Sequence, residues 1–423
     1  MTSPAPLTLD DIVRAGLCIG CGLCESLAGP ERVRIVMTPE GRERPAVEAP
    51  LDDAALTLIN AVCPGLKVEG PDPAASADGT QWDAVWGPAT RIAKGHAADP
   101  SIRFQGSAGG GLSALAIYLL ESGRVDFILH VAASSEQPMR TKRHLSFDRA
   151  QVMAAAGSRY GPAAPLVDFA QLLDRGRPFA FIGKPCDVAA LRNLARHDPR
   201  VERLVPYVLA FVCGGASEFA KTRDLVQGFG LEEKDVTLLR YRGMGNPGLT
   251  RVVARDGRNF TTTYGELWRD ENNWMLQFRC KICADAIGEL ADVAVSDVWP
   301  NGEPQGENAG FNGFIARTAK GRTLLEDAER DGALVLIEDR DFRFLDNVQP
   351  HQVHKKQALT ARLAAMRDAG AITPSYTGLR LEAAAATTDA AAQQASYAGM
   401  CDRLKRGDNR EPAAPPMADR ARE

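Results

Sequence analysis

The sequence predicts an α+β protein of three parts: a small cysteine-bearing segment at the N-terminus, an α/β core, and a C-terminal α/β domain with a second set of cysteines. Three observations lead to this class. Cysteines cluster near the start of the chain, a glycine-rich loop precedes an apolar helix pattern, and short apolar strand patterns alternate with helix patterns in between.

The composition is that of an ordinary globular protein with a sizeable core. Hydrophobic residues make up 45% and charged residues 25% of the 423 residues, and this length favours two or three domains. A net charge of −4 argues against nucleic acid or an anionic membrane as a partner. The first residues lack the features of a leader, and no apolar stretch approaches the roughly 18 residues of a membrane span. We therefore expect a cytoplasmic protein without direct membrane insertion.

Periodicity and turn residues locate the elements along the chain. The expected strands are 125–132, 178–182, 205–212, 249–254, 259–264, 291–295, 313–317 and 333–338. The expected helices are 112–121, 187–198 with Asp187 as its N-cap, 321–330 and 354–368. The expected parts are a cysteine segment at 1–80, an N-terminal α/β domain at 81–165, a C-terminal domain at 166–345, a helical extension at 346–380 and an Ala-, Gln- and Asp-rich disordered tail at 381–423.

The first cysteine group is the run CIGCGLC at 18–24 with a Cys-Pro pair downstream. Three thiolates two residues apart can bind one face of a cubane cluster if the backbone turns tightly, which Gly20 and Gly22 permit. A cysteine before proline supplies the fourth ligand. A zinc knuckle and unrelated buried thiols are the alternatives, although zinc sites usually consist of two separated pairs. The expected ligands of one 4Fe-4S cluster are Cys18, Cys21, Cys24 and Cys63.

The second cysteine group is dispersed: Cys186 in GKPCD, Cys213 in FVCGG, and Cys280 with Cys283 in CKIC. Two of these cysteines follow predicted strands, and strand ends converge at the crevice where open α/β sheets bind ligands. Four cysteines from three places can therefore form a second cluster site. On spacing alone, a structural zinc, a redox-active CxxC pair and scattered core cysteines are together as plausible as a cluster.

A glycine loop before a predicted helix is suited to a phosphate group. Glycines let the backbone approach closely, and the free N–H groups at a helix start attract anions. The alternative interpretation of this loop is a flexible turn without a ligand. The pattern is not GxGxxG, so a Rossmann nicotinamide site is not supported. The loop residues are Gly106, Ser107, Ala108, Gly109, Gly110 and Gly111.

Five further residues are candidates for cofactor contact. Ser158, Arg159 and Tyr160 offer a hydroxyl, a guanidinium and a ring in one short loop, and arginine pairs well with phosphate, although a structural role is nearly as plausible. Lys184 adjoins the second cysteine group, with a solvated side chain as the alternative. Asp297 follows a predicted strand and either contacts a cofactor or caps a turn.

The segment RYRGMGNPG is a candidate lining of the substrate side through Arg240, Arg242 and Asn246. The pair His351 and His354 is taken as incidental, because one weak i, i+3 pair is no metal pattern. No group of residues identifies a catalytic acid or base.

The order of motifs resembles the beta-subunit family of coenzyme F-420 hydrogenases and dehydrogenases, whose relatives include 7-hydroxymethyl chlorophyll a reductase. The likeness spans about 10–345 through CIGCGLC, GSAGGGLSAL, AGSRYGPAAPL, FIGKPCDVAALR, FVCGG, YRGMGNPG, CKICADAIGELADVAVSDVW and ARTAKGRTLLEDA. The resemblance implies an N-terminal ferredoxin-like cluster segment, a flavin-binding α/β core that holds FAD at 81–165, and two 4Fe-4S clusters. The second cluster would be bound by Cys186, Cys213, Cys280 and Cys283.

The expected function is that of an iron–sulfur flavoprotein oxidoreductase that passes electrons between a ferredoxin-type donor and a small-molecule substrate through FAD. The alternative is an electron-transfer subunit of a hydrogenase- or formate-dehydrogenase-type complex, with the deazaflavin as an open question. A homo-oligomer and a hetero-complex both stay open. A cluster-based DNA-binding sensor lacks support, because no helix with a basic patch is evident. The identity of the substrate does not follow from the sequence.

Overall fold

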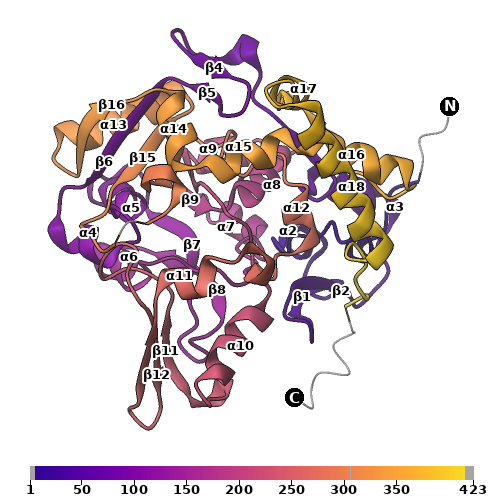
Figure 1. The fold of residues 1–423 in the computed structure, drawn as a ribbon, viewed down its shortest axis with the longest axis horizontal. Coiled ribbons are helices and arrows are strands. Elements are labelled where there is room, and N and C mark those ends of the chain that lie inside the picture. The colour runs from indigo at the N-terminus through magenta and orange to yellow at the C-terminus, as the bar shows by residue number, and fades with distance from the viewer. Residues whose placement is uncertain (1–4, 305, 415–423) are drawn as a thin grey trace.

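An eight-stranded mixed sheet lies at the centre of the computed structural model, which describes residues 5–304 and 306–414 (Figure 1). The order across the sheet is β16-β6-β15-β14-β10-β9-β7-β8. The strands are β6 (Arg91–Ala97), β7 (Phe127–Ala133), β8 (Thr141–Ser146), β9 (Phe179–Gly183), β10 (Tyr207–Phe211), β14 (Val293–Asp297), β15 (Asn312–Ala316) and β16 (Leu334–Asp339). The predicted α/β character is confirmed.

The four central strands of this sheet, β14, β10, β9 and β7, run parallel to one another, and the outer strands join them antiparallel. Their sequences are apolar on both faces, as in FAFIG and YVLAF, which is typical of parallel strands covered on both sides. Because the four strands run in one direction, their carboxyl ends meet at one edge of the sheet. That edge is where such folds bind ligands.

Helices cover both faces of the sheet. On one face, α5 (Gly111–Glu121) and α13 (Ala319–Arg330) pack against residues such as Ile128 and Leu209. On the other, α7 (Phe169–Asp174), α8 (Pro185–Ala195) and α16 (Leu359–Asp368) share one hydrophobic cluster with Phe127 and Leu129. Alternate residues of one strand thus enter different cores. Among the described residues, no helix has both the length and the apolar composition needed to cross a bilayer.

The N-terminal segment shares the core of the second face. Its elements are α1 (Leu9–Arg14), α2 (Leu23–Ala28), β1 (Val33–Met37), β2 (Glu43–Val47) and α3 (Asp53–Val62). Leu17, Cys21 and Ile59 belong to the same hydrophobic cluster as Val188 and Leu191 of α8. The predicted limit at residue 80 therefore does not mark a break in the core. The limit at 165 falls between strands of one sheet, because β7, before this limit, pairs with β9, after it.

A smaller layer projects from one end of the molecule. It contains the three-stranded antiparallel sheet of β11 (Val236–Arg240), β12 (Thr250–Ala254) and β13 (Asn259–Thr262), packed with α10 (Phe219–Gly228) and α11 (Tyr264–Trp268) (Figure 1). The predicted hairpin is confirmed. The remaining helices and strands of the described core region are α4 (Pro100–Gln105), α6 (Arg149–Ala154), α9 (Arg200–Leu204), α12 (Phe278–Lys281), β3 (Lys67–Glu69), β4 (Gln81–Asp83) and β5 (Gly87–Ala89).

The predicted disorder of 381–423 is wrong for the part that the structure describes. Here α17 (Leu381–Ala385) and α18 (Ala390–Arg406) form, and α18 packs beside α16 with Met400 fully buried. Small alanine side chains allow this close packing, while 415–423 lies outside the described residues. The predicted helix 354–368 is two helices, α15 (Pro350–Gln357) and α16, that meet at Ala358. Before them lies α14 (Phe342–Val348), and after them β17 (Ser375–Thr377), which pairs with β3.

Candidate functional site

A cavity of about 550 Å³ opens at the carboxyl edge of the parallel strands. This volume lies within the ordinary range for a small-molecule or cofactor pocket. The ends of all four parallel strands contribute to its wall, through Val131, Lys184, Cys213 and Asp297. The predicted cofactor residues that line it are Ser107, Gly110, Gly111, Ser158, Arg159, Tyr160, Lys184 and Asp297. Gly106, Ala108 and Gly109 lie behind this wall.

The glycine loop leads directly into α5, and the N-terminus of this helix lies at the pocket. Gly110 is the N-cap with a φ of 71°, and as a glycine it has no side chain of its own to cap the helix. The Gly111 N–H donates to Oδ1 of Asn312 at 2.8 Å, whereas Leu112 and Ser113 line the cavity. The positive end of the helix therefore faces the pocket, as a phosphate site requires. Gly109 has a packing role, since a Cβ there would lie 2.7 Å from Asn312 Oδ1.

The loop at 158–160 packs directly on the glycine loop. The Ser158 N–H and hydroxyl both donate to Oγ of Ser107, each at 2.9 Å. The Arg159 guanidinium donates to the hydroxyl of Thr141 and to four backbone carbonyls, those of 138–140 and of Leu239. Its donors are thus directed at the protein, and the structural alternative describes this residue better than a phosphate contact.

Lys184 is partly buried and ion-paired rather than solvated, with its side chain 16% exposed. Its Nζ lies 2.7 Å from Oδ2 of Asp187. Burial opposes the charge of Lys184, but Asp187 and Cys186 outweigh that effect and raise its pKa. The prediction that Asp187 caps α8 is wrong: Lys184 is the N-cap, and Asp187 lies in the first turn with only 1% exposure. Oδ1 of Asp187 has no hydrogen-bond partner, although the residue lines the pocket.

A further part of the pocket wall is aromatic and contains a buried arginine. Nη1 of Arg242 lies 2.8 Å from Oδ2 of Asp297, and its guanidinium sits 5.2 Å and 4.9 Å from the ring centres of Tyr264 and Trp299. Of the segment at 240–248, only Arg242 lines the cavity; Arg240 donates to the Gln105 carbonyl instead.

Sequence reasoning missed the rest of this wall. Trp268, Trp274 and Trp299 line it, which are three of the five tryptophans in the chain. The grouping of these three tryptophans within 268–299 was the sequence feature that could have indicated an aromatic pocket wall. Two histidines also line the pocket, His130 and the supposedly incidental His351. Burial lowers the pKa of each to about 4, with smaller contributions from His144 and Lys355 respectively.

The first cysteine group surrounds a small apolar cavity of about 30 Å³, lined by Cys18, Cys21, Cys24 and Cys63. Gly20 and Gly22 have φ values of 69° and 88°, so the expected tight turns are present. Burial raises the pKa of all four thiols, to about 11 for Cys63, and the charges of Cys18, Cys21 and Cys63 further disfavour ionisation of neighbouring thiols. No three His, Cys, Asp or Glu side chains of the described residues converge on a single ion position. Four sulfurs around a cavity fit the donor set of a multi-iron cluster.

The fold brings the second cysteine group together as well. Cys186 begins α8, Cys213 follows β10, Cys280 lies in α12 and Cys283 follows that helix. Burial raises the pKa of Cys186 well above its usual range and that of Cys213 to about 12, and the charges of Cys213 and Cys283 act on Cys186. The Ala216 N–H points at Sγ of Cys280, 3.4 Å away. These four sulfurs likewise fit one cluster.

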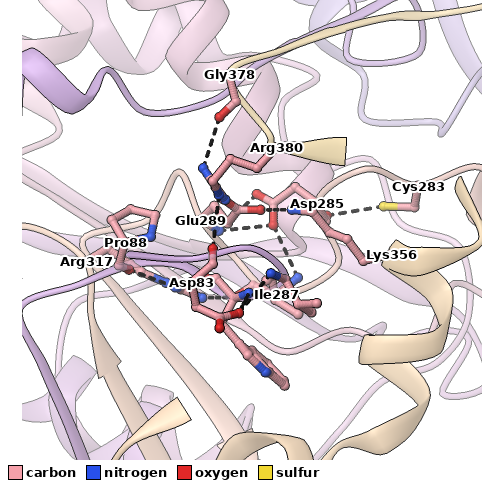
Figure 2. Close-up of polar contacts among 12 residues, drawn as sticks. Asp83, Pro88, Cys283, Asp285, Ile287, Glu289, Arg317, Lys356, Gly378 and Arg380 are labelled. Atoms are coloured by element: carbon pink, nitrogen blue, oxygen red, sulfur yellow. Dashed lines mark hydrogen bonds and ion pairs between the residues drawn. The ribbon is translucent and has the colours of Figure 1, made fainter. Parts of the chain in front are cut away.

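A buried charge cluster holds the loop that carries Cys283 (Figure 2). The Cys283 thiol donates to the Asp285 carbonyl at 3.2 Å. The Asp285 carboxylate accepts the Glu289 N–H at 3.0 Å, and the Glu289 carboxylate pairs with Lys356 and Arg380. The two cations belong to α15 and to the segment before α17, so the C-terminal region fastens this loop.

The two cysteine sites and the pocket adjoin one another. The charge of Asp187 disfavours ionisation of Cys21 in the first site and of Cys186 in the second. Asp187 and Cys213 both line the pocket. The three sites thus form a continuous series, with the second cysteine site next to the pocket.

Comparison with known proteins identifies related chains. Residues 92–170 match the family described as coenzyme F420 hydrogenase/dehydrogenase, beta subunit N-term, and 176–341 match its C terminus. F420-dependent formate dehydrogenase 1 subunit beta of Methanococcus maripaludis is 26% identical over 238 residues, 56% of this chain and 58% of the relative. Coenzyme F420-dependent sulfite reductase of Methanocaldococcus jannaschii is 23% identical over 57% of this chain and 38% of the relative. The chain thus matches less than two thirds of the length of these relatives.

A solved structure has a similar fold. A chain of the F420-reducing [NiFe] hydrogenase complex from Methanosarcina barkeri superposes with a TM-score of 0.52 and 19% identity. The superposition covers 67% of this chain and 96% of that one. The matched families begin at residue 92, so the first cysteine site lies outside them.

Proposed function

Because the chain belongs to the coenzyme F420 hydrogenase/dehydrogenase beta-subunit family, we propose that it is an oxidoreductase that binds FAD in the large pocket and a 4Fe-4S cluster at each cysteine site. Clusters exchange single electrons and a flavin exchanges one or two, so this set links one-electron protein partners to a two-electron small molecule. The observation that carries the proposal is the continuous series of first cysteine site, second cysteine site and pocket.

Each wall of the pocket has a distinct task in this proposal. The N-terminus of α5 and the paired hydroxyls of Ser107 and Ser158 bind the phosphates. The aromatic wall excludes water and stacks on planar rings. The pair of Arg242 with Asp297 fixes that wall, while the cation of Lys184 is placed beside the second cysteine site to balance negative charge.

Two roles agree with this chemistry. One is a self-contained reductase that a ferredoxin supplies with electrons. The other is a beta-type subunit that docks on a catalytic partner, and the names of the formate dehydrogenase relatives favour it. Anaerobic protein isolated alone should separate them: flavin reduction by reduced ferredoxin supports the first role, and reduction by the reduced deazaflavin supports the second.

The flavin site is best tested at Ser113, the third residue of α5, which lines the pocket. A carboxylate in the first turn stabilises an empty helix by about 0.3–1 kcal/mol but repels a phosphate bound there. Ser113→Asp should therefore weaken FAD retention by at least about tenfold, whereas the neutral Ser113→Asn should retain it. The measurement is flavin released by acid and identified by chromatography, with iron assayed on the same sample.

Equal FAD content in the two variants would refute the phosphate site at α5, and FMN in the wild type would refute the cofactor. Gly110→Val is the less informative variant. A Cβ at Gly110 would lie 2.6 Å from the Ile102 carbonyl oxygen in a left-handed backbone, so the loop would break whether or not it binds phosphate.

A further inference from the structure

One arginine side chain spans the two cysteine sites. Arg279 lies in α12 with 2% exposure, one residue before Cys280. Its Nη2 donates to the carbonyl of Pro64 at 2.7 Å, and its Nη1 donates to the carbonyl of Ile282 at 3.3 Å. Pro64 follows Cys63 of the first site, and Ile282 lies within the CKIC segment of the second. The guanidinium therefore bonds to the ligand loops of both sites at once.

This cation has no carboxylate counter-ion in the part of the chain that the structure describes. Its planar group lies 5.3 Å from the ring centre of Tyr376, and its Nε has no hydrogen-bond partner. An isolated buried charge is expensive unless anions compensate it. Four groups that become negative on ionisation act on Arg279, namely Tyr376 and three cysteines of the second site, Cys186, Cys280 and Cys283. Arg279 in turn favours the thiolate of Cys63 in the first site.

We propose that Arg279 is the shared counter-ion of the two cluster sites and raises the reduction potentials of both. This proposal rests on the proposed function, because it requires a cluster at each site. Four thiolates give a cluster net negative charge, and one more electron increases that charge. A cation buried between the sites stabilises the reduced form of each. Its two hydrogen bonds also hold the two ligand loops side by side.

The chain offers a matched comparison in Arg44. This guanidinium is also buried, with 1% exposure, and it favours the thiolate of Cys18. Unlike Arg279, it is paired with a carboxylate, since its Nε lies 2.7 Å from Oε2 of Glu411. Its Nη2 also donates to Oε1 of Gln277, the N-cap of α12, at 2.9 Å, but the cysteine charge that acts on it is that of Cys18 in the first site. Removing it should change the first site only, and by less than removing Arg279.

The experiment is a potentiometric titration of both clusters, followed by EPR, on Arg279→Gln, Arg279→Lys, Arg44→Gln and Tyr376→Phe, with iron and flavin assayed on each. Arg279→Gln should lower the ratio of reduced to oxidised cluster at a fixed potential by at least about tenfold at both sites, which is 59 mV for a one-electron couple. Arg279→Lys retains the charge and should stay close to the wild type. Tyr376→Phe removes only the hydroxyl that donates to Ile282 and should leave both ratios unchanged.

Each other outcome overturns the proposal. A change at the second site alone in Arg279→Gln would show that the cation is not shared. An equal change in Arg279→Lys or Tyr376→Phe would show that the effect comes from loop packing rather than from charge. These two variants still test the proposal if Arg279→Gln does not fold. Wild-type protein with about eight irons and an unchanged Arg279→Gln would overturn this inference alone. Wild-type protein with about four irons would overturn the two-cluster function as well.

Discussion

The two cysteine sites are built in opposite ways. The first takes three ligands from one short run, turns the backbone at two left-handed glycines and encloses an apolar cavity. The second draws its ligands from α8, from the end of β10 and from α12, and is surrounded by buried charges such as Lys184 and Arg279. The first site therefore depends on local backbone geometry, and the second on the assembled sheet and the charges behind it.

The largest effect is expected from a substitution that disrupts the buried charge cluster behind the second cysteine site. Lys356→Met removes one of two cations from the fully buried Glu289 carboxylate. Leaving a buried charge short of a partner should lower the free energy of unfolding by about 3–5 kcal/mol. Iron should be lost from the second site while the first retains its own. Urea unfolding and an iron assay measure both quantities.

The control for this variant is Lys234→Met, which removes an exposed lysine paired with Glu232 and should have no measurable effect. If Lys356→Met is as stable as the control, the charge cluster does not hold the Cys283 loop.

A smaller effect should be confined to the first site. Gly20 has a φ of 69°, and a Cβ there would lie 2.5 Å from the carbonyl oxygen of Glu43. Gly20→Ala should therefore destabilise the protein by about 2–4 kcal/mol and move the N–H that points at Sγ of Cys18. First-site iron should fall and second-site iron remain, as resolved by EPR.

The matched control is Gly228→Ala, at the end of α10 with open space around it, which should stabilise the protein by about 0.4–1 kcal/mol. Equal iron loss from both sites in Gly20→Ala would contradict the local character of the first site.

The smallest effect concerns the pocket wall, which belongs to neither site. Burial, together with the charge of His144, lowers the pKa of His130 to about 4, against about 6.5 in an unfolded chain. Between these values the unfolded chain binds a proton that the native protein does not, so stability is lost as the pH falls from 6.5 to 4. When the pH is lowered from 7.5 to 5, the free energy of unfolding should therefore fall by about 1–2 kcal/mol less in His130→Gln than in the wild type.

Urea unfolding at a series of pH values measures this difference, with the exposed His197→Gln as the matched variant. Identical pH dependence in His130→Gln and the wild type would mean that His130 keeps an ordinary pKa in the folded protein.

The sequence was informative where chemistry is local or where strand ends converge. Tight cysteine spacing predicted the grouping around the first cavity, and strand-end reasoning predicted that Cys186 and Cys213 lie at one edge of the sheet, where Lys184 and Asp297 also line the pocket. Prediction from the sequence was wrong where contacts between residues far apart in the chain determine the local structure. Asp187 resembles a helix cap in sequence, but the ion pair with Lys184 buries it inside the first turn.

The prediction of disorder for the C-terminal tail was wrong for a related reason. Its alanine-rich composition carries few large apolar side chains, so its order depends on contacts made only in the folded protein, such as those of α18 with α16 and of Glu411 with Arg44. The aromatic wall was missed because tryptophans spread over 268–299 show no periodicity that distinguishes a pocket from a core.

The contact between the two flanks of the chain also constrains how the protein is made. β17 pairs with β3, Glu411 bonds to Arg44, and Arg44 lies beside Cys18. A ribosome exposes the first cysteine site long before it releases residue 411. The surroundings of that site are therefore completed only once residue 411 has left the ribosome, so the proposed cluster would meet the site in its final form only after that point.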